Sequence, residues 1–230
     1  AAVVMHSLTK YIGGHGAVIG GVIIDGANFD WTADPKRQPL FNEPDPSYGG
    51  VVWGEAVPQI TGHNIPFAIR ARVCLLRDLG SCLSPDNAFQ VIQGIETLPL
   101  RMRQNCSNAE RVVDFLEDHP KVERVIYPKN YDGVVGERAE KYFNGGFGAL
   151  VGLELKGGIE AGKKFINSLK LFYHVANIGD ARSLAIHPAT TTHSQLTPEE
   201  QLASGVTPGY VRLSLGIEPV SYTHLTLPTS

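Results

Sequence analysis

The sequence has few of the features that mark several large classes of protein. Its 230 residues carry 20 Lys plus Arg against 23 Asp plus Glu, which gives a formal net charge of −3 and no basic excess for nucleic acid. The longest uncharged stretch near the start, residues 11–24, is rich in glycine and shorter than the ~20 apolar residues that span a bilayer. We therefore expect no nucleic acid partner and no membrane partner.

Cysteine is also scarce. Cys74, Cys82 and Cys106 are odd in number and match no zinc-binding spacing, which is typical of free thiols in a reducing compartment. The first five residues lack the basic and apolar segments of a signal peptide. We therefore predict a cytoplasmic protein.

Apolar residues make up 43 % of the chain, which is enough for a buried core. β-branched runs at residues 1–5 and 17–24 predict two strands that flank a glycine-rich loop. Residues 27–62 contain five prolines and are expected to form no regular element. Apolar spacing predicts a helix over residues 64–79, and Ser84 with Pro85 predicts the start of a long helix that continues towards Asp118.

After Pro120 the pattern changes to strands that alternate with helices, which predicts an α/β fold. The expected strands are residues 122–127, 149–155, 171–176 and 210–215, with a helix at 159–169. Thr197 and Glu200 form a capping box that predicts one more short helix. The long helix places a domain boundary near its middle, with one part at residues 1–105 and a second at 106–218. Residues 219–230 show no helical stripe, and we interpret them as a non-native tail.

The segment with the most chemical content is HSLTKYIGGHG at residues 6–16. Lys10 follows a predicted strand, with hydroxyls at Ser7 and Thr9 just before it and three glycines just after it. Hydroxyls donate hydrogen bonds to phosphate, and a desolvated lysine amine forms Schiff bases. These are the requirements of a pyridoxal phosphate lysine. A solvated lysine beside a turn is the commoner arrangement, so spacing alone leaves both interpretations open.

Several motifs together resemble the cysteine and methionine metabolism family of pyridoxal phosphate enzymes. The segment around Lys10 continues into a second family motif at residues 19–25. Further matching motifs follow in family order, namely LLRDLG at 75–80, NAF at 87–89, GIETL at 94–98, HPATTTH at 187–193 and VRLSLG at 211–216. The resemblance implies the pyridoxal phosphate-dependent transferase fold (fold type I). On this basis residues 1–105 are the end of the large cofactor domain and the bridging helix, and residues 106–218 are the smaller C-terminal α/β domain.

The resemblance also implies roles for single residues. Lys10 would bind pyridoxal 5'-phosphate covalently and move protons during turnover, while Ser7 and Thr9 would bind the cofactor phosphate. Arg212 would bind the α-carboxylate of the substrate, which suits the two parallel donors of a guanidinium. Asn177 occupies the turn where lyases and synthases of the family tend to carry Ser-Leu-Gly, and it would contribute a side-chain or backbone contact to the same carboxylate. Without the resemblance, Arg212 is more simply a surface arginine and Asn177 a turn residue.

The implied reaction is that of the sulfhydrylase branch of the family. Sulfide replaces the acetoxy group of O-acetylhomoserine and gives homocysteine and acetate in methionine biosynthesis. Cystathionine γ-synthase, γ-lyase and O-succinylhomoserine sulfhydrylase activities remain alternatives, and so does a truncated, inactive chain. The resemblance further implies small-molecule substrates and a homo-oligomer, dimer or tetramer, with the active site at the subunit interface and with cofactor-binding residues upstream of Ala1.

The histidines are candidates for metal ligands and for a catalytic base. His187 and His193 lie six residues apart without further metal ligands nearby, so no metal site is expected and a structural or substrate-proximal role is favoured. His15 lies close to Lys10, but the resemblance assigns proton transfer to the lysine.

Overall fold

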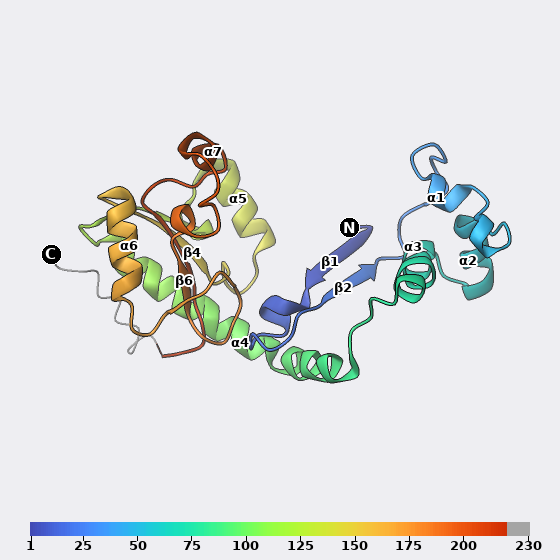
Figure 1. Cartoon of the computed structure of the whole chain (residues 1–230), viewed down its shortest axis with the longest axis horizontal. Helices are drawn as coiled ribbons and strands as arrows, with labels where there is room; N and C mark the ends of the chain where they lie inside the picture. Colours follow the sequence, from blue (N-terminus) through green and yellow to red (C-terminus); the bar gives the residue numbers. More distant parts are fainter. Residues whose placement is uncertain (220–230) are drawn as a thin grey trace. The chain divides into compact units, whose positions relative to one another are not determined.

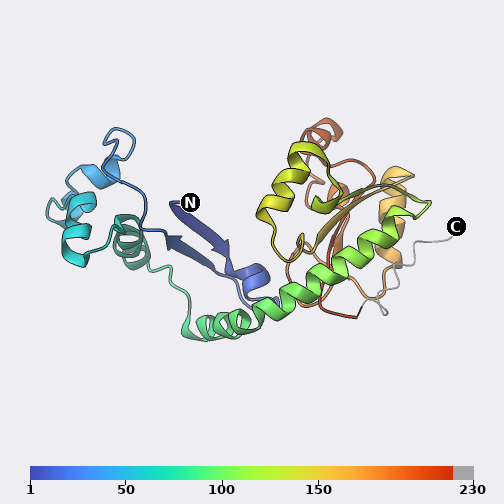
Figure 2. The same ribbon diagram turned by 180° about the vertical axis from the view of Figure 1, so that it is seen from behind.

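The computed structural model describes residues 1–219 and forms two compact units (Figures 1 and 2). Unit 1 consists of Ala1–Leu8 and Ile19–Phe89, and unit 2 consists of Thr9–Val18 and the chain from Gln90 onward. In the described part of the chain, no helix has both the length and the apolar character needed to cross a membrane. The non-native tail expected from residue 219 onward lies, except for Pro219, outside the described residues.

Unit 1 contains an antiparallel hairpin and a set of short helices. Strands β1 (Val3–Ser7) and β2 (Gly21–Asp25) pair in a continuous register from Val3 with Asp25 to Ser7 with Gly21. The two strands were predicted from the sequence. The remaining elements are α1 (Pro39–Asn42), η2 (Pro46–Tyr48), α2 (Trp53–Thr61), α3 (Pro66–Arg70) and η3 (Ala71–Arg77).

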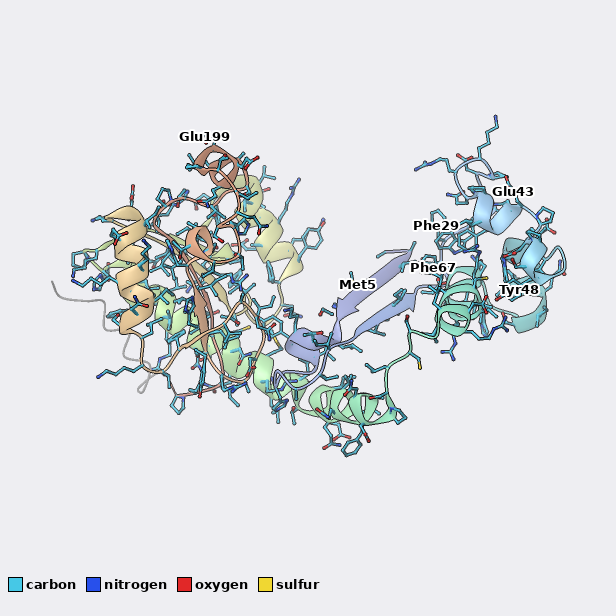
Figure 3. All side chains as sticks on the ribbon, in the orientation of Figure 1. Met5, Phe29, Glu43, Tyr48, Phe67 and Glu199 are labelled. Carbon is cyan, nitrogen blue, oxygen red and sulfur yellow. The ribbon has the colours of Figure 1, made fainter. Side chains whose placement is uncertain are left out.

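The helix α2 contradicts the prediction that residues 27–62 form no regular element. It continues through Pro58 and ends at Gly62, which has a positive φ of 70°. Its Trp53 and Val57 are buried and form a small core with Phe41. Partly buried aromatic residues pack against that core, among them Phe67, which Figure 3 labels. Burial of these large side chains offsets the cost of a proline inside the helix. A prediction from the number of prolines and glycines alone does not include this tertiary burial.

Unit 2 is an α/β arrangement around one mixed sheet. It includes the turn η1 (Leu8–Ile12), most of helix α4 (Pro85–Glu117) and the elements that follow α4. Those elements are β3 (Val122–Ile126), η4 (Pro128–Asn130), α5 (Gly133–Tyr142), β4 (Leu150–Leu155), α6 (Gly158–Ser168), β5 (Tyr173–His174), β6 (Leu184–Ile186), η5 (Pro188–Thr190), α7 (Pro198–Ala203) and β7 (Tyr210–Ser214).

The sheet has the strand order β3-β4-β7-β6-β5. All neighbours pair antiparallel except β5 and β6, which are parallel. Arg212 is the register partner of Gly152 on β4 and of Ile186 on β6, so it lies in the middle of the sheet.

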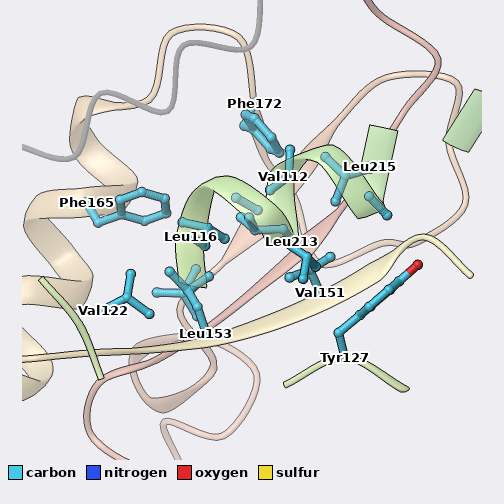
Figure 4. Packing of buried hydrophobic residues seen from close by; sticks show 14 of the residues in the cluster. Val112, Leu116, Val122, Tyr127, Val151, Leu153, Phe165, Phe172, Leu213 and Leu215 are labelled. Atoms are coloured by element: carbon cyan, nitrogen blue, oxygen red, sulfur yellow. The ribbon is translucent and has the colours of Figure 1, made fainter. Parts of the chain in front are cut away.

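The main core covers one face of this sheet (Figure 4). Alternate residues of β7, Val211 and Leu213, are fully buried in it, together with side chains from the second half of α4 and from α6. Because side chains alternate along a strand, Tyr210, Arg212 and Ser214 point to the opposite face. The core therefore fixes the strand that positions Arg212.

Most elements expected in unit 2 are present within a few residues. The capping box is confirmed, since the Thr197 side chain accepts from Glu200 N–H and the Glu200 carboxylate accepts from Thr197 N–H. The sequence did not predict α5 or β6. β6 has only three residues, all of them buried, and its position depends on pairing with β5 and β7 rather than on a local pattern.

Candidate active site

Lys10 lies in the turn η1, directly after β1. Its backbone φ and ψ of −94° and −131° interrupt the helical turn. The side chain is half-buried, and Nζ donates a hydrogen bond of 2.5 Å to Oδ1 of Asn177. Lys10 and Asn177, which are 167 positions apart in the chain, are therefore in direct contact.

Asn177 belongs to the loop between β5 and β6 and contacts two charged groups. Its side-chain oxygen accepts from Lys10, and its backbone oxygen accepts from Nη2 of Arg212 at 3.1 Å. Two further bonds fix this loop. Gly179 N–H donates to Ser214 Oγ at 3.0 Å, and Ala181 N–H donates to the carbonyl of Gly14 at 2.8 Å.

Gly179 allows the loop to approach the lysine turn closely. Its φ is 73°, and a Cβ at this position would lie 2.7 Å from Cγ of Tyr11 and 2.9 Å from its Cα. A side chain here would separate the loop from the residue that follows Lys10. From the sequence, Asn177 was expected at a turn near the substrate carboxylate, and no contact of this turn with Lys10 was predicted. The structure shows that the turn lies against the lysine.

Arg212 projects from β7 on the face opposite the core. Burial lowers the pKa of its guanidinium, while the nearby Tyr210 and Tyr11 raise it. A hollow of about 260 Å³ adjoins it and is lined mainly by apolar and aromatic side chains, including Ile126, Tyr131 and Tyr210. A guanidinium beside such a hollow can bind a carboxylate while the rest of a small ligand occupies the apolar space.

Tyr11 is a member of this cluster that the sequence reasoning did not single out. Burial raises the pKa of its hydroxyl, while neighbouring Ser214 and Arg212 act in the opposite direction. Its position directly after Lys10 in the motif was the available signal. Its proximity to Ser214 and Arg212 requires the fold, because those residues are some 200 positions away.

The remaining predicted site residues are Ser7 and Thr9, the expected ligands of the cofactor phosphate. Ser7 is exposed at the end of β1 in unit 1, and Thr9 is half-buried in η1 of unit 2. Both hydroxyls precede Lys10 along the chain. Their role as phosphate ligands remains a prediction.

The histidines have structural contacts. His187 is buried, its Nε2–H donates to the carbonyl of Pro208 at 2.8 Å, and its Nδ1 accepts from the hydroxyl of Thr190 at 2.9 Å. His15 is exposed, and its Nδ1–H donates to the carbonyl of Gly13. Within residues 1–219 no group of three or more His, Cys, Asp or Glu side chains is arranged to hold a metal ion.

The donor set fits pyridoxal phosphate. A lysine amine forms a Schiff base with an aldehyde. Lys10 is bound to an amide, and none of the ion pairs between described residues includes it. Arg212, on the other side of the same asparagine, adds a site for a carboxylate. An amino acid and an aldehyde cofactor would meet between these groups.

Comparison with known proteins agrees with this geometry. Residues 1–222 match the family model described as Cys/Met metabolism PLP-dependent enzyme. The chain belongs to this family. Its cofactor is therefore pyridoxal phosphate, and the fold class predicted from the sequence is confirmed.

Named relatives cover nearly the whole chain. This chain is 54 % identical over 230 residues to O-acetyl-L-homoserine sulfhydrylase of Leptospira meyeri. It is 50 % identical over 220 residues to O-acetyl-L-homoserine sulfhydrylase 1 of Thermus thermophilus. A homocysteine synthase of Schizosaccharomyces pombe is 46 % identical. These matches cover 96 % of the chain and 50 to 51 % of the relatives, so the chain spans about half the length of the proteins it matches.

A solved structure has a similar fold. A crystal structure from Campylobacter jejuni, described as an O-acetylhomoserine (thiol)-lyase, is 37 % identical and superposes with a TM-score of 0.88. It covers 99 % of this chain, and the chain covers 53 % of it. That protein carries N'-pyridoxyl-lysine-5'-monophosphate, a lysine joined to the cofactor.

Proposed function

We propose that this chain is the part of a pyridoxal phosphate enzyme that supplies the cofactor lysine and the substrate carboxylate site, and that the enzyme converts O-acetylhomoserine and sulfide to homocysteine and acetate. The observation that carries the proposal is the array of Lys10, Asn177 and Arg212, joined by hydrogen bonds of 2.5 and 3.1 Å. The names of the relatives at 46 to 54 % identity support the choice of substrates.

Each residue has a distinct task in this proposal. The guanidinium of Arg212 binds the α-carboxylate of the amino acid and orients it. The amide of Asn177 orients the Lys10 amine, which carries the cofactor and then holds and returns a proton at Nζ. Ser7 and Thr9 donate hydrogen bonds to the cofactor phosphate. When bound, pyridoxal phosphate supplies an electron sink for negative charge at the substrate.

The hollow beside Arg212 suits the remainder of such a substrate. Its apolar lining excludes water around a short side chain, while the carboxylate stays at the guanidinium. Binding at two points, the lysine side and the arginine side, fixes the orientation of the amino acid. Such orientation is a large part of the advantage that an enzyme has over free reactants.

The test uses the full-length enzyme with purified substrates. O-acetylhomoserine and sulfide should give homocysteine and acetate, and borohydride should fix the cofactor to Lys10, as shown by peptide mass spectrometry. Turnover of O-succinylhomoserine in preference to the acetyl ester, condensation with cysteine, or release of a keto acid without sulfide would each assign another reaction of the family. A cofactor adduct on a different lysine would remove Lys10 from the proposed site.

A homo-oligomer and a cytoplasmic location belong to the same proposal. Helix α4 exposes Ile92, Ile95 and Leu100 by 50 to 66 %, which is apolar surface that a neighbouring subunit would cover. Cys74, Cys82 and Cys106 are free thiols, the state that a reducing compartment maintains. Sedimentation of the full-length enzyme tests the first point, and a monomer with activity would contradict it.

A further inference from the structure

Arg101 is a buried arginine whose guanidinium binds carbonyl groups. It lies on α4 and is only 5 % exposed. Among the described residues it takes part in no ion pair. Burial lowers its pKa. Burying a guanidinium without a counter-ion is unfavourable unless its donors are satisfied, so the acceptors it binds indicate its purpose.

Those acceptors lie in the turn that carries Lys10. Arg101 Nη1 donates to the carbonyl of Tyr11 at 2.7 Å, and Nη2 donates to the carbonyl of Ile12 at 3.3 Å. These are the two residues directly after the lysine. Arg101 also binds its own helix, because Nη2 donates to the carbonyl of Gly94 at 2.6 Å and Nε donates to Thr97 Oγ1 at 3.1 Å.

The helix face around Arg101 is shaped for the same turn. Gly94, Thr97 and Arg101 lie at i, i+3 and i+7, which places them on one face of α4. A Cβ at Gly94 would collide with the carbonyls of Ile12 and Gly13, so glycine is required where the turn meets the helix. The Thr97 hydroxyl orients the guanidinium. Gly94 and Thr97 belong to the GIETL motif, to which the proposed reaction assigns no role.

The backbone of the lysine turn is thus held at every carbonyl from Lys10 to Gly14. The carbonyl of Lys10 accepts from Gly14 N–H, that of Gly13 from His15, and that of Gly14 from Ala181 N–H. The two carbonyls between them are the ones that Arg101 holds. Without Arg101, the carbonyls of Tyr11 and Ile12 would lose these donors, so the two peptide groups after Lys10 would be held less tightly.

We propose that Arg101 is a positioning residue for Lys10, because it fixes the peptide groups that follow the lysine and so sets the direction in which the amine meets the cofactor and the substrate. This inference rests on the proposed function of Lys10. Arg101 itself touches neither Asn177 nor Arg212, so its removal leaves the carboxylate site in place.

The test compares Arg101→Gln and Arg101→Lys with wild type in the full-length enzyme. Arg103→Gln is the matched control, since Arg103 is exposed on the same helix. Three quantities are measured per folded, cofactor-loaded subunit. They are the visible circular dichroism of the bound cofactor, the rate at which borohydride-fixable cofactor forms on Lys10, and kcat with the KM for the amino acid.

Loss of the hydrogen bonds from Arg101 should change the orientation of the Lys10 amine without changing how the substrate carboxylate is bound. We expect a weakened dichroic band and a kcat about 100-fold lower in Arg101→Gln, the scale of a misplacement of about 1 Å. Arg101→Lys keeps the charge but not the planar donors, and should lose about tenfold, as for one hydrogen bond to a charged group. The KM should stay at the wild-type value in both, and Arg103→Gln should match wild type throughout.

A purely structural Arg101 would give a different result. The variants would then unfold at lower temperature, but each loaded subunit would keep the wild-type dichroism and kcat, and the inference would be overturned. If Arg101→Gln does not fold, the milder Thr97→Val decides, since it removes only the hydroxyl that orients Nε. A wild-type dichroic band and kcat in both Thr97→Val and Arg101→Lys would count against a positioning role for Arg101. If the wild-type enzyme forms no adduct on Lys10, the proposed function and this inference fail together.

Discussion

The side-chain oxygen of Asn177 lies 2.5 Å from Nζ of Lys10, although 167 positions separate the two residues in the chain. The same asparagine accepts from Arg212 through its backbone oxygen. One residue therefore sets the spacing between the group proposed to carry the cofactor and the group proposed to bind the substrate carboxylate. A substitution at Asn177 alters the side chain that contacts Lys10 but keeps the backbone oxygen that contacts Arg212, so it should affect the lysine first.

Asn177→Asp places a carboxylate at the lysine amine. An opposite charge at this distance favours the ammonium form, so less neutral amine is present at a given pH and condensation with the cofactor slows at neutral pH. The rate should recover as the pH is raised. Asn177→Ala removes the acceptor without adding charge and serves as the control. Stopped-flow absorbance of cofactor binding against pH measures the effect, and identical profiles for the two variants would contradict the charge argument.

The contact between Lys10 and Asn177 also shows where sequence reasoning ends. The lysine motif, the capping box at Thr197 and the start of α4 at Ser84 are local patterns, and each was predicted from neighbouring residues. Ser84 Oγ indeed accepts from Asn87 N–H at 3.2 Å, as an N-cap should. The pairing of Lys10 with Asn177 is a consequence of the whole sheet, and no spacing in the sequence encodes it.

Other features depended on tertiary burial. Helix α2 forms despite Pro58 because Trp53 and Val57 are buried against Phe41. β6 is three residues long, and its burial between β5 and β7 defines it. The roles of Ser7, Thr9, Asn177 and Arg212 came from family resemblance, and in the structure Arg212 donates to the backbone oxygen of Asn177.

Arg212→Lys tests the carboxylate site. An ammonium cannot reproduce two parallel hydrogen bonds to a carboxylate, so the KM for the amino acid should rise by about one to two orders of magnitude, the equivalent of 1.5–3 kcal/mol. The KM for sulfide should change little. Arg124→Lys is the control, since Arg124 is 61 % exposed on β3 and pairs with Glu154. Steady-state kinetics on the full-length enzyme measure both constants, and equal changes in both would point to a structural role.

Truncation of the core should affect stability strongly. Leu153 on β4 is fully buried in the main cluster, so Leu153→Ala should lower the free energy of unfolding by about 2–5 kcal/mol. Leu202 on α7 is 55 % exposed, and Leu202→Ala should stay within about 0.5 kcal/mol of wild type. Urea unfolding followed by circular dichroism compares them. Equal losses would mean that the two leucines are buried alike.

The cysteines should differ in reactivity in the isolated 230-residue chain. Burial raises the pKa of the Cys106 thiol, which lowers the fraction of reactive thiolate at any given pH. Cys82 is exposed. Alkylation by iodoacetamide at pH 8 should therefore modify Cys82 first, and Cys106 should react only as the pH is raised or the chain is unfolded in urea. Peptide mass spectrometry follows each site, and equal rates at pH 8 would contradict the burial of Cys106.

The two units should also differ in their resistance to proteolysis. Among described residues, the buried cluster of unit 2 contains 17 residues and that of unit 1 contains three, so unit 1 has far less apolar burial to oppose local opening. Lys36 and Arg37 are exposed and lie between elements. Brief trypsin treatment of the isolated chain should cut there first and leave a resistant fragment that includes residues 122–218. A boundary near residue 105 predicts that a low-specificity protease trims this fragment within α4. Survival of residues 1–89 with digestion of 122–218 would reverse the order of stability and contradict the argument from the cores.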